Sequence, residues 1–461
     1  MTAPRLDELA PCFQGIIPSI ITTCGRDGEP NVTYLSQVHH VDERRVALSC
    51  QFFNKTKRNV AENPLASVMV IHPVSFDAYR LALRFDHSET AGPLFDTMAT
   101  RIQVIASHTG MTGIFRLLSA DVYQVISVER VEGFLLPPDE SAPGETVGLA
   151  PGPLSELRSL QIVSDRICRA ADLDALLSGT LQALDELLGF SHSMVLLPDV
   201  TGEHLAALAT RGYDGTGIGA EVRFGQGIIG TAAAQRRMIR MAGVGAELRY
   251  GRAIRARVKE TGGERSLAPE IPLPGLPDAQ AQFALPLLKG DRLVGILAVE
   301  SRDPLCFDEW DEAFLQIVAN QIAMGIERLQ GADDDPGPPA GLGHRAPAPA
   351  RTRIRTFCYY RNDDCVFVDG EYLIRNIPAK ILWKLLTLHR CEGRLEFTNR
   401  ELRLDPSLGL PPLKDNLESR LILLRRRLQE KCPDVRLVPV RRGRFALELD
   451  CRIESVEKDT A

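Results

Sequence analysis

The sequence lacks several features that would place the protein in a specialised class. None of its 10 cysteines forms a C-x-x-C pair, which argues against a zinc ribbon and a disulfide framework. No apolar run reaches the roughly 18 residues of a membrane-spanning helix. The first residues, MTAPRLDELAPCFQG, lack a basic start followed by an apolar core, so we expect no secretion signal. These absences predict a cytoplasmic protein with reduced thiols and no membrane partner.

Charge is distributed unevenly along the 461 residues, whose composition of 44% hydrophobic and 25% charged residues is typical of globular domains. Residues 351–461 carry 23 Lys and Arg against 17 Asp and Glu, a net charge of +6. The remainder carries a net charge of −12 within a total of −6. An acidic body with a basic tail predicts a polyanionic partner for the tail.

Two segments divide the chain. Residues 134–153 are rich in Pro, Gly and acidic residues, and residues 331–350 contain almost no large apolar side chain. Neither segment can bury enough apolar surface to fold alone, so we interpret both as linkers. The chain then consists of three domains, at 1–133, 154–330 and 351–461, each of ordinary domain size.

The first domain begins with short β-rich runs. IIPSIITT at 16–23, NVTYLSQVHHVD and RRVALSCQFF are separated by turns, which is the pattern of a β-meander. Together with the turn from Asp27 to Pro30, the strand that ends at Ser49, the cluster N-K-T-K-R-N and Asn63-Pro64, this order resembles the pyridoxamine 5′-phosphate oxidase-like family. The resemblance covers residues 10–130 and implies an FMN-binding split β-barrel.

A concentration of cations and a hydroxyl at a helix start suits a phosphate. By the family resemblance, the residues implied to bind FMN are Ser49, Lys55, Thr56 and Lys57. The alternative is a solvated basic helix start on a barrel that has lost its cofactor.

Three histidines, His39, His40 and His72, suggest haem, and an iron–sulfur cluster is a further alternative to FMN. Adjacent strand residues point to opposite faces, so His39 and His40 cannot simply face one iron. We therefore expect structural or exposed histidines.

The middle domain begins with two amphipathic helices over 154–188 and ends in a specific string, QFALPLLKGDRLVGILAVES, followed by Phe-Asp and a long helix. Asp308 is the expected N-cap, with Asp311 and Glu312 in the first turn. This string resembles the end of a GAF domain, and the resemblance covers residues 154–329. It implies a mixed α/β sensor with an antiparallel sheet and a small-molecule ligand.

Residues 236–272 are strongly basic, with Arg236, Arg237, Arg240, Arg249, Arg252, Arg255 and Arg257. They could cover an anionic ligand, but we expect a mobile solvated loop. Cys168 and Cys306 could report redox state, although a free Cys is more often a small buried hydrophobe. The helix 309–330 is expected to pack against its copy in a homodimer.

The third domain follows the order hairpin, three helices, hairpin. CVFVDGEYLIR gives the first hairpin, a helix begins at Pro378, Asn399 can cap a second, and LKDNLESRLILLRRRLQEK is a third. VRLVPVRRGRFALEL closes the domain with two strands around an Arg-rich turn. This order resembles the winged-helix effector domain of OmpR-type response regulators over about 85 residues. The chain has no receiver domain upstream, so the input must differ.

Helical spacing predicts that Leu417, Leu421, Leu424 and Leu428 of the third helix face the core. Amide, hydroxyl and guanidinium groups on the outward face would then suit base edges and phosphates. The candidate DNA-binding residues of this helix and of the wing are Lys414, Asn416, Ser419, Arg420, Arg427, Arg441, Arg442 and Arg444. The alternative is that Arg425 to Arg427 form only a solvated helix face.

The sequence thus predicts a multidomain α+β protein made of an FMN-binding split β-barrel, a GAF α/β sensor domain and a C-terminal winged helix. Its predicted function is that of a one-component transcription regulator, in which a ligand, cofactor or redox signal controls DNA binding by a homodimer. No catalytic residues or metal ligands are predicted. The alternatives are a flavin-dependent oxidoreductase with accessory domains, and a scaffold whose wing binds another protein.

Overall fold

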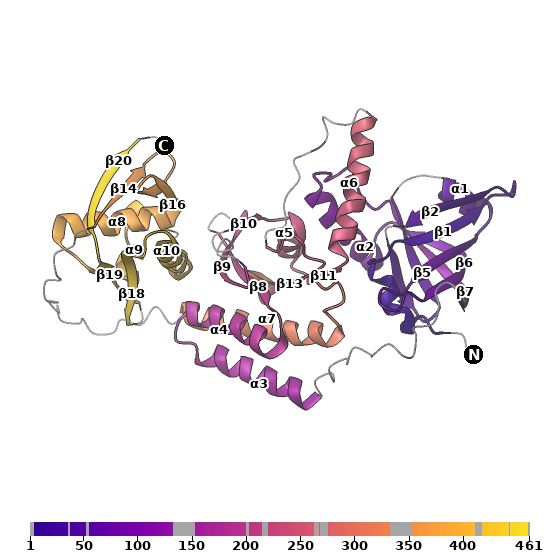
Figure 1. The fold of residues 1–461 in the computed structure, drawn as a ribbon, viewed down its shortest axis with the longest axis horizontal. Helices are drawn as coiled ribbons and strands as arrows, with labels where there is room; N and C mark the ends of the chain where they lie inside the picture. The colour runs from indigo at the N-terminus through magenta and orange to yellow at the C-terminus, as the bar shows by residue number, and fades with distance from the viewer. Residues whose placement is uncertain are drawn as a thin grey trace, which may run out of the picture. The chain divides into compact units, whose positions relative to one another are not determined.

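A computed structural model describes residues 4–35, 37–51, 55–131, 153–199, 202–213, 220–261, 267, 275–331, 353–410, 417–441 and 443–459 (Figure 1). The two predicted linkers lie almost wholly outside these residues. The chain forms two compact units, one of Met1–Arg158, Val222–Pro286 and Ala298–Leu315, the other of Ser159–Glu221, Leu287–Leu297 and Gln316–Ala461. None of the described helices is long and apolar enough to cross a membrane.

The N-terminal domain is a seven-stranded antiparallel sheet in the order β2-β1-β5-β6-β7-β4-β3. A short 3-10 helix and two α-helices accompany it (Figure 1). Its elements are η1 (Asp7–Gln14), β1 (Ser19–Cys24), β2 (Pro30–Leu35), β3 (Val38–Asp42), β4 (Arg45–Cys50), α1 (Lys55–Glu62), β5 (Leu65–Ile71), β6 (Ala78–Glu89), α2 (Pro93–His108) and β7 (Ser119–Arg130). Alternating residues such as Val46, Val68 and Leu81 bury the inner face, as the period-2 pattern predicts.

The middle domain has a six-stranded sheet in the order β10-β9-β8-β13-β12-β11. Its elements are α3 (Pro153–Arg169), α4 (Leu173–Leu188), β8 (His192–Pro198), β9 (His204–Arg211), β10 (Glu221–Arg223), α5 (Gly227–Gln235), β11 (Ile239–Ala242), α6 (Val244–Glu260), β12 (Ala281–Lys289), β13 (Arg292–Ser301) and α7 (Glu309–Gly331). Asp172 caps α4 by accepting a hydrogen bond from the Ala175 backbone N–H at 2.8 Å. The predicted cap of the last helix is confirmed, because Asp308 Oδ1 accepts from the Asp311 N–H at 2.9 Å.

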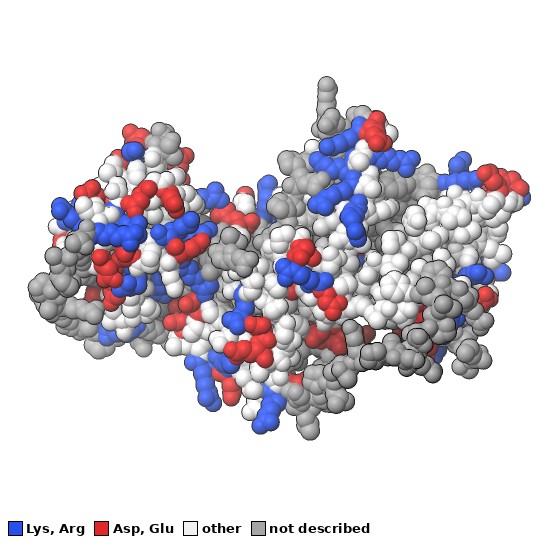
Figure 2. All heavy atoms as spheres, in the orientation of Figure 1, with Lys and Arg blue, Asp and Glu red and all other residues white. Residues whose placement is uncertain are grey.

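Within the basic segment 236–272, the described residues 236–261 are not the mobile loop that their charge suggested. Residues 239–242 form β11, which pairs with β12, and residues 244–260 form the helix α6. Burial of Val244 and Leu248 fixes one face of this helix. Figure 2 shows Lys and Arg side chains gathered over α6, on the face left to solvent.

The C-terminal domain has two sheets, β16-β15-β14-β20 and β17-β19-β18, and its own hydrophobic core. Its elements are β14 (Ile354–Tyr360), β15 (Cys365–Val368), β16 (Glu371–Arg375), α8 (Asn376–Glu392), β17 (Glu396–Thr398), α9 (Asn399–Arg403), η4 (Pro406–Leu408), α10 (Leu417–Lys431), β18 (Val435–Arg441), β19 (Arg444–Leu449) and β20 (Arg452–Lys458). The predicted hairpins and helices are present. The strands β14, β17 and β20 were not predicted, and β20 pairs in parallel with β14.

One predicted helix cap is wrong by a residue. Thr398, not Asn399, caps α9: its side chain accepts from the Glu401 N–H at 3.2 Å, and Glu401 accepts from the Thr398 N–H at 3.0 Å. This reciprocal capping box satisfies two of the backbone donors at the helix start.

Candidate functional site

The start of α1 carries the cations that were predicted to bind a flavin phosphate. Lys57 Nζ lies 2.6 Å from Asp121 Oδ1 and donates to the Ser88 hydroxyl at 2.8 Å. Both Ser88 Oγ and Ser119 Oγ also donate to Asp121 Oδ1, at 2.6 and 2.8 Å. Asp121 is buried, so this cluster gives it the cation and donors that a buried carboxylate requires.

The other three predicted phosphate ligands point elsewhere. Lys55 pairs with Glu29 at 2.8 Å, and Thr56 Oγ1 accepts from Asn31 Nδ2 at 2.9 Å. Ser49 lies opposite Ala120 in the β4–β7 register. Because neighbouring residues of a strand alternate between faces, Ser49 lies on the face opposite Asp121 and its cluster.

The four residues therefore do not converge on one anion. A phosphate that approached Lys57 would meet the buried Asp121 carboxylate beside it, and like charges at such separations repel strongly. Taking Lys57 away from Asp121 would leave a buried carboxylate without its cation. The observed side chains thus do not fit an FMN phosphate site built from Ser49, Lys55, Thr56 and Lys57.

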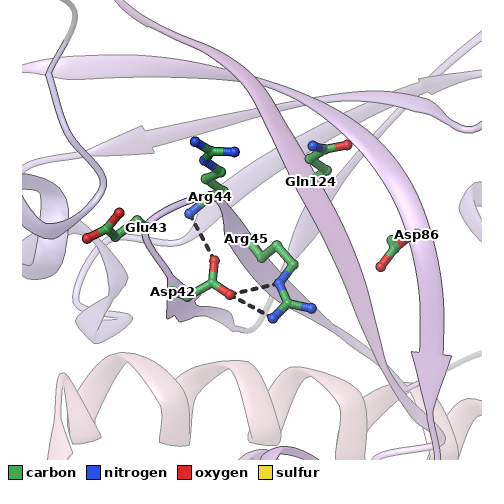
Figure 3. A pocket seen from close by; sticks show the side chains of 6 residues that line it. All are labelled: Asp42, Glu43, Arg44, Arg45, Asp86 and Gln124. Atoms are coloured by element: carbon green, nitrogen blue, oxygen red, sulfur yellow. Dashed lines mark hydrogen bonds and ion pairs between the residues drawn. The ribbon is translucent and has the colours of Figure 1, made fainter.

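A surface recess of the barrel, about 530 Å³ in volume, lies at the β3–β4 turn (Figure 3). Asp42 accepts from the Arg44 backbone N–H at 2.9 Å and from Arg45 Nε at 2.8 Å. Its lining is almost entirely charged, and Asp42 and Arg45 of this lining form an ion pair. Small-molecule sites are mostly apolar with a few polar groups, so this recess is a poor candidate.

The three histidines do not converge on one point. His39 and His40 are neighbours on β3, and a ring nitrogen of His72 caps a turn by accepting from the Val74 and Ser75 backbone N–H groups at 3.3 and 3.2 Å. Within the described ranges, no three His, Cys, Asp or Glu side chains cluster as metal ligands do. All 10 cysteines are free thiols.

A buried carboxylate marks the middle domain. Glu300 on β13 accepts from the Leu276 backbone N–H at 2.6 Å and from Gln282 Nε2 at 2.8 Å. Sequence reasoning missed it, because Glu300 falls within a run of apolar strand residues and its partners lie on a separate loop and strand. Both Glu300 and Gln282 are buried.

The positions of the described residues of α10 agree with the prediction for the core leucines and disagree with it for two candidate DNA-binding residues. Leu417, Leu421, Leu424 and Leu428 lie in the domain core, as predicted. Lys414 and Asn416 lie outside the described residues. The prediction that Ser419 and Arg420 face solvent is wrong in this structure, because both are buried.

The wing residues are partly described. Arg441 is exposed at the end of β18, and Arg444 opposes it at the start of β19. Arg442 lies outside the described residues. The Asn399 backbone N–H donates to the Gly443 carbonyl at 2.9 Å, which connects the wing turn to the start of α9.

Part of α10 lies against α4 of the middle domain, within the second compact unit. Arg426 pairs with Asp174 and donates to the Ser178 hydroxyl at 2.6 Å. Burial lowers the pKa of Arg425, while the nearby Asp172 opposes that shift. Arg427 instead pairs with Glu430 of its own helix at 3.0 Å. The acidic first turn of α4 therefore contacts Arg426 of α10, which was not among the predicted DNA-binding residues.

Comparison with known protein families identifies two of the three domains. Residues 6–116 match the model of the pyridoxamine 5′-phosphate oxidase family, and residues 170–327 match that of the GAF domain. The chain therefore contains a split-barrel domain of this oxidase type and a GAF domain, a type of small-molecule sensing domain. The C-terminal region is α+β of unassigned type.

Solved structures with similar parts include the GAF domain of a phosphoenolpyruvate-protein phosphotransferase from Coxiella burnetii, with 20% identity over 39% of this chain and 96% of that one, at a TM-score of 0.31. The free methionine-R-sulfoxide reductase of Neisseria meningitidis is 19% identical over 40% of this chain and 96% of that one, at a TM-score of 0.31. An FMN-binding protein of Syntrophomonas wolfei is 21% identical over 29% of this chain and 90% of that one, at a TM-score of 0.23. None of the curated protein sequences matches this chain.

Proposed function

We propose that the protein is a transcription regulator whose C-terminal domain is a DNA-binding winged helix controlled by the GAF domain. The observation that carries this proposal is an arginine-rich third helix followed by a hairpin whose turn is bounded by Arg441 and Arg444. Guanidinium groups on a helix and on an adjacent hairpin suit the phosphates and base edges of DNA. The net charge of +6 in residues 351–461 favours the same partner.

In the structure, Arg420 is buried and Arg426 pairs with Asp174 of α4, so we interpret this arrangement as the state in which α10 is held against α4. In this arrangement, α4 covers part of the face of α10 that would contact DNA. The proposed regulator therefore binds DNA only after α10 leaves α4, and a signal received by the GAF domain would act on that step.

Dimerisation is part of this proposal. Trp310, Ile317 and Met324 are exposed on α7 at intervals of one heptad. Side chains repeated every seven residues form the stripe through which two helices pair. A second copy of the same helix is the occupant that this stripe fits, and Met324→Glu should convert a dimer to a monomer in light scattering coupled to gel filtration.

The alternative function, that of a flavin-dependent oxidoreductase, receives no comparable support. Three of the predicted phosphate ligands already have partners within the protein, namely Asp121, Glu29 and Asn31. The domains are proposed to extend over residues 1–133, 154–330 and 351–461, separated by linkers.

DNA binding by the full-length protein tests the proposal. Fluorescence anisotropy with DNA from upstream of its own gene should show binding that weakens steeply with salt, because phosphate contacts release counterions. Arg444→Ala should weaken binding, whereas the charge-matched control Arg5→Ala, on the N-terminal domain, should not. Binding that does not depend on salt concentration would contradict the proposed function. The absence of binding both by the wild type and by a variant in which α10 is released from α4 would contradict it as well.

A further inference from the structure

A second, smaller recess lies beside the edge strand β3, within the first compact unit. Its volume is about 220 Å³. The lining residues that matter are Phe13 and Gln14 of η1, His39 and His40 of β3, Arg101 of α2 and Arg240 of β11.

Two polar atoms of this lining are buried and have no hydrogen-bond partner among the described residues. They are His40 Nε2 and Gln14 Oε1. Folded proteins pair nearly all such atoms, because the lost hydration is otherwise uncompensated. The ring of His40 is nonetheless held in place by Phe13, with centroids 6.2 Å apart and planes 8° from parallel. A positioned ring with an unpaired nitrogen in a recess is the arrangement of a ligand site.

The two arginines give the recess its charge and are held rigidly. Arg101 Nε donates to Glu247 at 2.5 Å, and its Nη2 donates to the Gln14 and Ala242 carbonyls at 2.7 and 3.1 Å. Arg240 Nη2 donates to the Phe307 carbonyl at 2.6 Å. Their carboxylate partners lie outside the recess.

None of the residues that line the recess carries a carboxylate. Burial lowers the pKa of His39, and the neighbouring His40 and Arg101 lower it further, as expected where positive charge gathers. The side chains that face the recess are thus neutral or cationic, which favours an anion.

We infer that this recess binds a small carboxylic acid that also carries a hydrogen-bond donor, such as a hydroxy acid or an amino acid. The carboxylate would accept from His40 Nε2 and lie near the guanidinium groups. The hydroxyl or ammonium group would donate to Gln14 Oε1. The volume corresponds to that of about seven water molecules, which admits an acid of a few carbons.

Titration calorimetry and thermal melting of the full-length protein test the inference with three four-carbon acids. Malate and aspartate carry a donor beside a carboxylate, and succinate is the same skeleton without it. We expect malate or aspartate to bind and to raise the melting temperature, with succinate at least about tenfold weaker. If none of the three binds at millimolar concentration, the inference is wrong.

Two variants assign the binding to this recess. His40→Phe keeps the ring stacked on Phe13 but removes the nitrogen, and should abolish binding of all three acids. Gln14→Leu should remove the preference for malate over succinate. Because each removes an unpaired buried polar atom, neither should lower the melting temperature of the unliganded protein. The matched control His87→Phe, on β6 outside the recess, should bind as the wild type does. Wild-type binding by His40→Phe would overturn the inference.

Discussion

The contact between α10 and α4 leads to a quantitative prediction for the proposed regulator. Asp174→Asn removes the carboxylate that pairs with Arg426 but leaves the N-cap Asp172 in place. The substitution should shift α10 away from α4 and strengthen DNA binding by the full-length protein. When α4 covers α10 in some of the molecules, the measured DNA affinity is the intrinsic affinity multiplied by the fraction of molecules that are competent to bind.

The magnitude follows from the exposure of the pair. The Arg426 side chain is 17% exposed and that of Asp174 is 46% exposed, so the pair is intermediate between a surface and a buried ion pair. Exposed pairs contribute up to about 1 kcal/mol, and charged hydrogen bonds a little more. Loss of about 1 kcal/mol from the covered state should lower the apparent Kd about fivefold.

A matched control separates release from simple electrostatics. Asp185→Asn, on the same helix, removes a carboxylate that pairs with Arg211 at 2.6 Å and changes net charge equally. Fluorescence anisotropy should show the gain for Asp174→Asn and little change for Asp185→Asn. Equal gains in both variants would mean that reduced negative charge alone strengthens binding, and no gain in either would mean that α4 does not restrain α10.

Three further predictions concern other parts of the molecule. Lys57→Met should destabilise the N-terminal domain by about 3 kcal/mol, because it leaves Asp121 buried without a cation, and adding Asp121→Asn should restore most of the melting temperature. Arg444→Ala should reduce the salt dependence of DNA affinity by about one counterion, read from the slope of log Kd against log salt. In the native protein, alkylation followed by mass spectrometry should modify exposed Cys168 before Cys12, since burial raises the pKa of Cys12 to about 11. Unchanged stability, an unchanged slope, or equal labelling would contradict the respective argument.

Local patterns made much of the fold predictable. The leucines of α10 were predicted to be core residues because helical spacing is a property of neighbouring residues. The cap at Asp308 was recognisable for the same reason, since its donors lie within one turn. The prediction of a loop was wrong for residues 239–260, because the basic side chains were given more weight than the apolar residues Val244 and Leu248, which fix α6.

The candidate sites depended on partners that are distant in sequence. Lys57 was assigned to a phosphate because Asp121, 64 residues away, could not be placed beside it. The burial of Arg420 and the pairing of Arg426 with Asp174, 252 residues away, could not follow from helical spacing within one domain. The recess at His40 was missed because its lining comes from four separate segments.

The parallel pairing of β20 with β14 has a consequence for biosynthesis. The first strand of the C-terminal domain, beginning at Ile354, pairs early with β15 but gains its second neighbour only when Arg452 to Lys458 have been made. Domains generally fold in turn as a chain leaves the ribosome, and long-range strand pairing is slow. The split barrel and the GAF domain can therefore mature earlier in synthesis, whereas the C-terminal domain completes its β16-β15-β14-β20 sheet only when β20 has been made.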